Sequence, residues 1–473
     1  MSIYPKKSYD YCANLFISMP KTSFVNRLDI YLFYILFALI LLYKVQLLSP
    51  LMVAVFKIRY VLYIYLYLRI AIFYKWELNT KKLLVLIFLY FTIFIAIHTY
   101  FLYGKDVAIA GLTRFINVAL LAPLASVLFE NLKQFQKFIN LWLFVIVIGG
   151  LTLIYQLLGG DLSWLVESYI ASRGILLRFN TLLGGPNTGG MASAITYIIA
   201  LLIIRPLAVK IVLLTVALIL LIFSLSKAAI AGWIIATAII VCLKVGKRSN
   251  IFKINRTKFQ KMTTIMIVTL LFIFCITTYS SPIREYIVKY ATIALLAFTG
   301  GDTGDPTSQS VLEDLSMRMI SMTQKGISLA MEQSSFYPLN FLVGSSFGIA
   351  GSAAFQLKAD VILPHNTFSE IYLVGGILLL FIFGLILVKT WSRLWLLNKV
   401  NDYYKALLIV FLTIVAYMPS YPIIYEPILG SLFWLIVGLV ANSNFSLKKH
   451  SLNGVSISNG VDRQKLINEN PDY

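Results

Sequence analysis

Long apolar blocks separated by short polar connections run along almost the entire chain. Most blocks contain about 20 residues, the length at which an α-helix crosses the hydrocarbon core of a bilayer. The connections between them are basic or contain Gly, Pro and Asn. An even number of spans would place both ends of the chain on one side of a membrane. The pattern predicts twelve helices, centred near residues 38, 62, 92, 117, 148, 195, 216, 236, 271, 378, 413 and 434.

The composition supports this interpretation and excludes several classes of protein. The 473 residues are 59% hydrophobic and 13% charged, with a mean hydropathy of +0.83, which is not the composition of soluble domains. We therefore expect an all-α polytopic membrane protein with one membrane domain. The formal net charge of +20 does not indicate nucleic-acid binding, because the Lys and Arg residues do not share a surface with interleaved aromatic residues. The three cysteines are too scattered for a disulfide framework or a metal site.

The distribution of charge predicts which connections face the cytoplasm. Basic residues, almost without acids, occur in connections 75–82, 130–137, 205–210, 244–261 and 389–405. By the positive-inside rule these connections are cytoplasmic. The opposite set faces outward and consists of 101–106, 159–186, 224–227, 281–366 and 421–426. Only two of the outer connections are long, and long connections are usually functional or disordered.

These assignments divide the chain into five parts. The parts are a cytoplasmic N-terminus at 1–27, helices one to nine with outer loop 159–186 at 28–280, a large outer loop at 281–366, helices ten to twelve at 367–444, and a cytoplasmic tail at 445–473. A stripe of Leu and Met predicts an amphipathic helix at about 310–332 within the large loop. Lys57, Arg59 and Arg69 interrupt the second helix, whose tyrosines also fit an interfacial position.

The residues PHNTFSEIYLVGG place a histidine at the outer mouth of the tenth helix. His365 is followed by Asn366, and Ser369 and Glu370 lie one turn further in. A neutral imidazole is well suited to accept a proton at neutral pH, and Asn366 or Glu370 would fix its ring. The alternative is that His365 only caps the helix at the headgroup level.

Three further outer stretches carry candidate residues. The turn GGPNTGG, reached through Arg178, lets the backbone approach a ligand, and Asn187 is placed to cap the following helix. The short turn SLSKAAIAG holds Lys227, and the large loop holds Arg318. Structural alternatives exist for each of these. They are a simple glycine turn, a lysine that reaches the headgroups, and a local pair between Arg318 and Asp314.

The order of these stretches resembles the O-antigen polymerase and ligase family of bacterial membrane glycosyltransferases. The resemblance covers about residues 170–390 and is most specific in the His-Asn motif followed by a Glu and a Gly-Gly. It implies a GT-C-like fold of about twelve transmembrane helices with a large, partly helical periplasmic loop, in the bacterial inner membrane. Where the family usually has Ser-Arg, this chain has Ser226-Lys227, which keeps the charge but not the bidentate fork.

The resemblance also implies a reaction. A glycan on a polyprenyl (undecaprenyl) diphosphate is transferred to a sugar hydroxyl on the periplasmic side of the membrane. His365 would be the base, and Arg318 with Lys227 and Arg178 would bind the departing diphosphate. Asn187, Asn366 and Glu370 are further candidates for contact with the substrate. No metal or other cofactor is expected. The partners implied are the lipid-linked oligosaccharide, membrane lipid and a chain-length regulator protein.

Four functions remain to be compared. We favour a polymerase that joins lipid-linked repeat units, and the alternative within the family is a ligase that transfers the finished glycan to lipid A-core. A polysaccharide flippase fits twelve helices, but transporters place polar groups near the bilayer midplane, whereas the candidate residues here gather at outer helix ends. A structural scaffold would leave the large outer loop unexplained.

Overall fold

The computed structural model describes residues 23–43, 50–74, 79–162, 165, 170–173, 176–179, 181–224, 226, 229, 233–234, 236–237, 338–347, 366–398, 402–419 and 421–442. These residues are mostly helical, as the apolar pattern predicts. The helix predicted near residue 271, the amphipathic helix at 310–332 and the tail at 445–473 lie outside the described residues.

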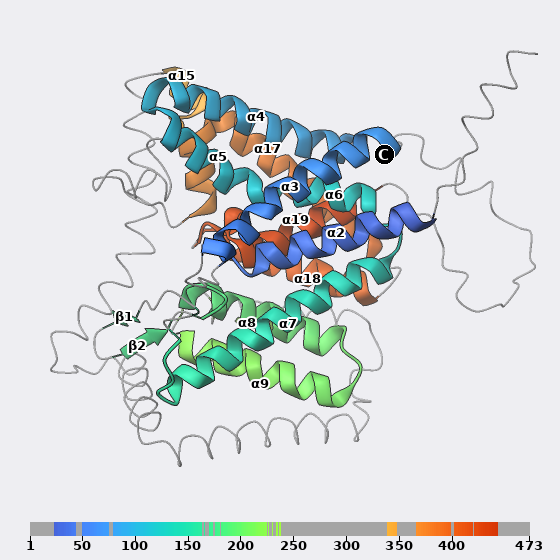
Figure 1. Cartoon of the computed structure of the whole chain (residues 1–473), viewed down its shortest axis with the longest axis vertical. Helices are drawn as coiled ribbons and strands as arrows, with labels where there is room; N and C mark the ends of the chain where they lie inside the picture. Colours follow the sequence, from blue (N-terminus) through green and yellow to red (C-terminus); the bar gives the residue numbers. More distant parts are fainter. Residues whose placement is uncertain are drawn as a thin grey trace, which may run out of the picture.

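The long helices run across the view of Figure 1, so that their ends lie to its left and right. The helical elements are α2 (Ser23–Leu41), α3 (Pro50–Phe73), α4 (Thr80–Tyr103), α5 (Lys105–Ala119), α6 (Leu121–Leu128), α7 (Leu132–Leu157), α8 (Pro186–Leu202), α9 (Leu207–Ser224), α15 (Pro338–Val343), α17 (Thr367–Leu397), α18 (Asp402–Tyr417), the 3-10 turn η2 (Ile423–Tyr425) and α19 (Pro427–Ala441). Strands β1 (Ile170–Arg173) and β2 (Leu176–Phe179) form one antiparallel hairpin.

Within the described residues, five helical segments are long and apolar enough to cross a membrane. They are Thr80–Tyr103, Lys105–Leu128, Leu132–Leu157, Leu207–Ser224 and Thr367–Leu397. Two shorter apolar helices, Tyr403–Tyr417 and Pro427–Ala441, accompany them. The described part of the chain therefore has the character of a membrane-embedded helical bundle. The full number of twelve spans stays a prediction.

The span Lys105–Leu128 is broken into α5 and α6 by a proline. Pro123 cannot donate a backbone hydrogen bond and its ring clashes with the carbonyl four residues earlier, and α5 ends at that residue, Ala119. Two tyrosines of α3 donate their hydroxyls to carbonyls near the break: Tyr63 to Asn117, and Tyr67 to Leu120 at 2.9 Å. These contacts give two of the tyrosines in α3 a partner within the protein.

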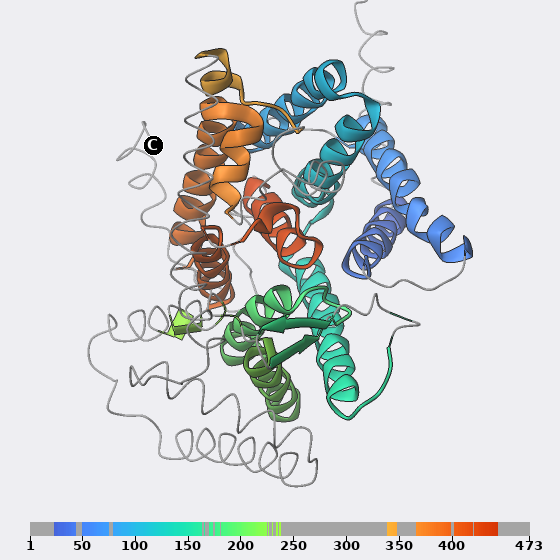
Figure 2. The same ribbon diagram turned by 90° about the vertical axis from the view of Figure 1, so that its left-hand side faces the viewer.

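Contacts at the two ends of the bundle agree with part of the predicted grouping of the connections. At the end that bears connections 75–82, 130–137, 205–210 and 389–405, here called the basic end, Asn79 Nδ2 donates to Ala441 O and Asn442 Nδ2 donates to Phe129 O, each at 2.7 Å. At the opposite end, Thr367 Oγ1 donates to Tyr421 O at 2.7 Å. The hairpin β1–β2 and α15 lie toward the left-hand, opposite end in Figure 1, which faces the viewer in Figure 2. Which end faces the cytoplasm stays a prediction.

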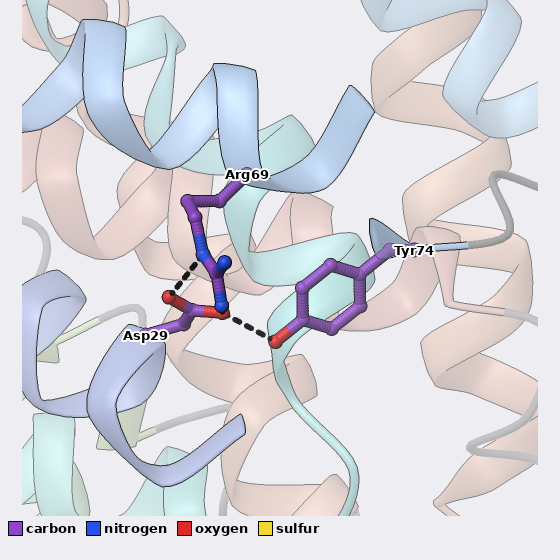
Figure 3. A network of polar contacts seen from close by, with 3 residues as sticks. All are labelled: Asp29, Arg69 and Tyr74. Atoms are coloured by element: carbon purple, nitrogen blue, oxygen red, sulfur yellow. Dashed lines mark hydrogen bonds and ion pairs between the residues drawn. The ribbon is translucent and has the colours of Figure 1, made fainter. Parts of the chain in front are cut away.

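An ion pair near the basic end joins α3 to α2 (Figure 3). Arg69 Nε lies 3.2 Å from Asp29 Oδ1, and the hydroxyl of Tyr74 donates to Asp29 Oδ2 at 2.9 Å. Asp29 is wholly buried, and the guanidinium also lies 4.1 Å from the centre of the Phe73 ring. One of the cations that interrupt the apolar pattern of α3 is therefore paired inside the protein, which lowers the cost of placing its charge in an apolar helix.

Helix α19 lies at the centre of the bundle, and every residue from Ile428 to Ala441 is buried. It contacts α2, α4, α5, α6, α7, α8, α17 and α18. The helix is apolar on all sides, and here the neighbouring helices, rather than lipid, cover it. The indole N–H groups of Trp142 and Trp434 donate to Ile428 O and Ile424 O, each at 2.9 Å, and so fix the start of the helix.

Candidate functional site

The candidate site is built around the N-terminal end of α17, where the most specific sequence motif lies. Asn366 is the N-cap residue, and its Oδ1 accepts hydrogen bonds from the backbone N–H groups of Phe368 and Ser369 at 2.9 and 3.3 Å. The capping role considered for His365 therefore belongs to Asn366. His365 itself lies just outside the described residues.

Glu370 lies in the first turn of α17 and points into the bundle. Its side chain is 0% exposed, and Oε1 lies 3.1 Å from Nη1 of Arg114 on α5. The Arg114 guanidinium also lies 4.8 Å from the centre of the Tyr425 ring, and the Tyr425 hydroxyl lies beside the same carboxylate. We call these three residues, Arg114, Glu370 and Tyr425, the buried polar cluster. The first turn of a helix favours a negative charge, which suits the position of Glu370.

The buried polar cluster is incompletely satisfied. Among the described residues, neither oxygen of Glu370, nor Nη1 of Arg114, nor the Tyr425 hydroxyl has a well-aligned hydrogen-bond partner. Buried polar atoms are nearly always hydrogen-bonded, and exceptions call for a functional or structural explanation. The Arg114 side chain keeps 21% of its surface exposed, although its Nη1 is buried. The cluster therefore combines a wholly buried carboxylate with a partly exposed arginine side chain.

The connection between α18 and α19 ties this end of α17 to α8. Thr367 Oγ1 donates to Tyr421 O at 2.7 Å and accepts from Ile423 N at 3.0 Å, and the Tyr421 hydroxyl lies 3.3 Å from Thr188 Oγ1. Burial, with Glu426 nearby, raises the pKa of Tyr421 to about 12, so its hydroxyl stays protonated at physiological pH. The His-Asn motif and the GGPNTGG turn are thus both hydrogen-bonded to the connection between α18 and α19 through Thr367 and Thr188.

The role expected for Asn187 as a helix cap is wrong. Helix α8 begins at Pro186, and its N-cap is Gly185, which makes no side-chain capping bond. A proline suits the first helical position because its φ is preset and that position needs no N–H, so the helix begins one residue before Asn187. Gly190, the last residue of the GGPNTGG stretch, lies in α8, and a Cβ there would collide with Ser224 of α9. That glycine serves close helix packing.

Helix α17 is broken at Gly376, where φ is 64° and ψ is −165°. The freed carbonyls of Leu373 and Val374 accept hydrogen bonds from Ser345 N and Ser346 N at 2.7 and 3.3 Å. Irregular backbone inside a membrane-spanning segment requires hydrogen-bond partners within the protein. Residues 344–347 provide these partners. We call residues 344–347 the wedge segment.

The wedge segment lies within the predicted outer loop 281–366 but is buried inside the bundle, so the prediction that this whole stretch lies outside the membrane domain is wrong at residues 344–347. Phe347 N donates to Thr99 Oγ1 of α4 at 3.1 Å, and the Phe347 ring lies 5.1 Å from that of Phe115 on α5. The Phe115 ring in turn lies 4.3 Å from that of Tyr425. Three aromatic rings therefore connect the wedge segment with the buried polar cluster.

The structure brings together only some of the residues predicted from the sequence. Asn366 and Glu370 lie at the same helix start, and Asn187 lies in α8 next to Thr188. Arg178 lies in strand β2 and pairs in register with Ala171. Arg318 and Lys227 lie outside the described residues, as His365 does. The described ranges contain no group of three or more His, Cys, Asp or Glu side chains that could hold a metal ion.

Sequence reasoning missed Arg114. The signal was present, because Arg114 is a lone cation inside the apolar block centred near 117, and such a residue usually has a buried partner and a function. Its partner, Glu370, was singled out for a different reason. A search for the acid that matches each buried cation would have connected the two blocks.

Comparison with known proteins adds no assignment. No model of a known protein family matches the chain, and no curated protein matches it at significant similarity.

Proposed function

We propose that the protein is a membrane glycosyltransferase that polymerises surface polysaccharide repeat units carried on a polyprenyl diphosphate. The observation that carries the proposal is the position of the most specific motif. Asn366 and Glu370 lie at the end of the bundle opposite the basic connections, beside the partly exposed side chain of Arg114. That end would be the periplasmic one if the basic end faces the cytoplasm of a bacterial inner membrane.

The proposed reaction joins two lipid-linked glycans. The hydroxyl oxygen of the acceptor sugar attacks the anomeric carbon of the donor, and the bond from that carbon to the diphosphate oxygen breaks. The hydroxyl proton passes to His365, and the diphosphate leaves with the bonding electron pair. Arg318, with Lys227 and Arg178, would stabilise its negative charge.

The buried polar cluster would act as support for this site. Asn366 fixes the first turn of α17, and Arg114 with Glu370 holds that turn against α5. A base acts efficiently only when its position is held within a fraction of an ångström. His365 directly precedes the cap residue, so the cluster would set the place from which the base acts.

The proposal is tested by the reaction of the purified protein in detergent with a polyprenyl diphosphate-linked repeat unit. Lengthened lipid-linked glycan is expected from the wild type, and no lengthening from His365→Gln at equal protein level, since glutamine cannot take up the proton. Lys227→Arg should remain active and serves as the matched control. Normal elongation by His365→Gln would remove His365 from the mechanism.

Two other functions have different outcomes in the same experiment. A ligase would leave the donor unextended until lipid A-core is supplied as acceptor. A polysaccharide transporter is favoured by one observation, the break of α17 at Gly376, because broken helices are common at transporter binding sites. A transporter would change no glycan in detergent and would act only across a sealed membrane.

A further inference from the structure

Three cations from two helices gather at the basic end. Lys81 lies in the first turn of α4, while Lys389 and Arg393 lie one turn apart near the end of α17. The two helices run in opposite directions and pack against each other, as the ring contact between Phe88 and Phe383 at 6.1 Å shows further along. Lys389 and Arg393 both lie close enough to Lys81 for their positive charges to repel its positive charge.

The charge of this group is not balanced within the described part of the chain. The ion pairs of Asp29 with Arg69 and of Glu370 with Arg114 include none of the three cations. Lys81 and Arg393 are half-buried, and Lys389 is exposed. Like charges held together at a partly buried place repel one another, and an anion bound between them removes this repulsion.

The group lies at the level where a membrane surface is expected. Trp391 and Trp395, on the same turns of α17, are each 46% exposed, and exposed Trp residues gather at the boundary between hydrocarbon and headgroups. Towards the middle of the bundle, Leu83 and Ile87 of α4 are exposed apolar side chains. An anion at Lys81 would therefore have water on one side and the acyl-chain region on the other.

We propose that Lys81, Lys389 and Arg393 form a binding site for the phosphate headgroup of an anionic membrane phospholipid. The guanidinium of Arg393 can bind two phosphate oxygens at once, and the two ammonium groups add charge from either side. Basic pockets between transmembrane helices on the cytoplasmic side are typical of such headgroup sites. The lipid would hold the ends of α4 and α17 together. This site is independent of the proposed glycosyltransferase reaction.

The test measures lipid binding to the purified full-length protein in neutral detergent by native mass spectrometry. Wild type is titrated with phosphatidylglycerol or phosphatidylcholine, and preferential binding of phosphatidylglycerol is expected. Lys389→Gln/Arg393→Gln should weaken phosphatidylglycerol binding roughly 25-fold, about fivefold for each cation removed. The charge-preserving variant Lys389→Arg, which leaves the guanidinium of Arg393 in place, should stay within about twofold of wild type.

A matched control removes two other cations from the basic end. Lys133 and Lys137 lie one turn apart at the start of α7 and are exposed, and Lys133→Gln/Lys137→Gln should leave binding unchanged. An equal loss in this control would show diffuse attraction by net charge and overturn the site. The site would also be overturned by equal binding of both lipids, or by inorganic phosphate that displaces phosphatidylglycerol at equal concentration. If Lys389→Gln/Arg393→Gln does not fold, Lys81→Gln is compared with wild type instead. Roughly fivefold weaker binding of phosphatidylglycerol by this variant supports the site, and unchanged binding overturns it.

Discussion

Removal of one partner from the Arg114–Glu370 pair should destabilise the protein more than removal of both. Leaving one charge of a buried pair without its partner costs about 3–5 kcal/mol. In Glu370→Gln the unpaired group is Arg114, whose side chain keeps 21% exposure. Because the Arg114 side chain is not fully enclosed, we expect the lower value, about 3 kcal/mol.

The opposite single substitution leaves the acid unpaired. In Arg114→Met, Glu370 remains at 0% exposure with neither oxygen well hydrogen-bonded. We therefore expect the upper value, about 5 kcal/mol. In Arg114→Met/Glu370→Leu no buried charge remains, and replacing a buried ion pair by apolar residues of similar volume is often close to neutral. The double variant should thus be more stable than either single variant.

The assay is equilibrium unfolding in mixed micelles with increasing SDS, followed by tryptophan fluorescence. Lys105→Met, an exposed cation at the start of the same helix, is the matched control and should leave the free energy of unfolding unchanged. If the double variant loses the sum of the two single losses, the two residues are not energetically coupled. The assignment of the pair as support for the start of α17 would then be wrong.

Three further experiments test other parts of the structure. Gly376→Ala introduces a Cβ at a φ of 64°, where it would collide with the backbone of Leu342 and Gly344. The substitution should therefore lower the free energy of unfolding by about 2 kcal/mol or more. An unchanged free energy of unfolding would show that α17 is not broken at Gly376. Tyr74→Phe removes one hydrogen bond to the buried carboxylate of Asp29 and should cost about 2 kcal/mol. Asp29→Asn should cost more than Tyr74→Phe in the same unfolding assay, and the reverse order would contradict the ion pair. For topology, an impermeant thiol reagent applied from the periplasmic side should label Ser308→Cys and spare Ser249→Cys, while the opposite labelling would reverse the predicted orientation.

The sequence predicted the helices well where length and apolar character suffice. The blocks centred near 92, 148 and 378 correspond to α4, α7 and α17, because a continuous apolar run of that length has few other stable forms in a membrane. Part of the grouping of connections also followed, because successive spans place alternate connections at opposite ends of the bundle, whereas charge predicts only which end faces the cytoplasm.

Features that depend on a distant partner were not predicted. The Gly-Gly in α17 appears within a continuous apolar run, and only contact with the wedge segment explains why the helix breaks there. Arg114 and Glu370 lie in different apolar blocks, so no local pattern connects them. The start of α8 was misplaced for a local reason, because Asn187 was weighed as a cap without regard to Pro186 beside it.

The central position of α19 has a consequence for how the chain is assembled during synthesis. The surfaces that α19 covers on the surrounding helices exist before it does, because it follows them in the chain. Until it arrives, the indole N–H of Trp142 lacks its acceptor, the carbonyl of Ile428, in surroundings with little water. Until then, the surfaces that α19 later covers must face lipid, another protein or one another. Entry of α19 would replace those contacts and convert a loose set of inserted helices into a packed bundle.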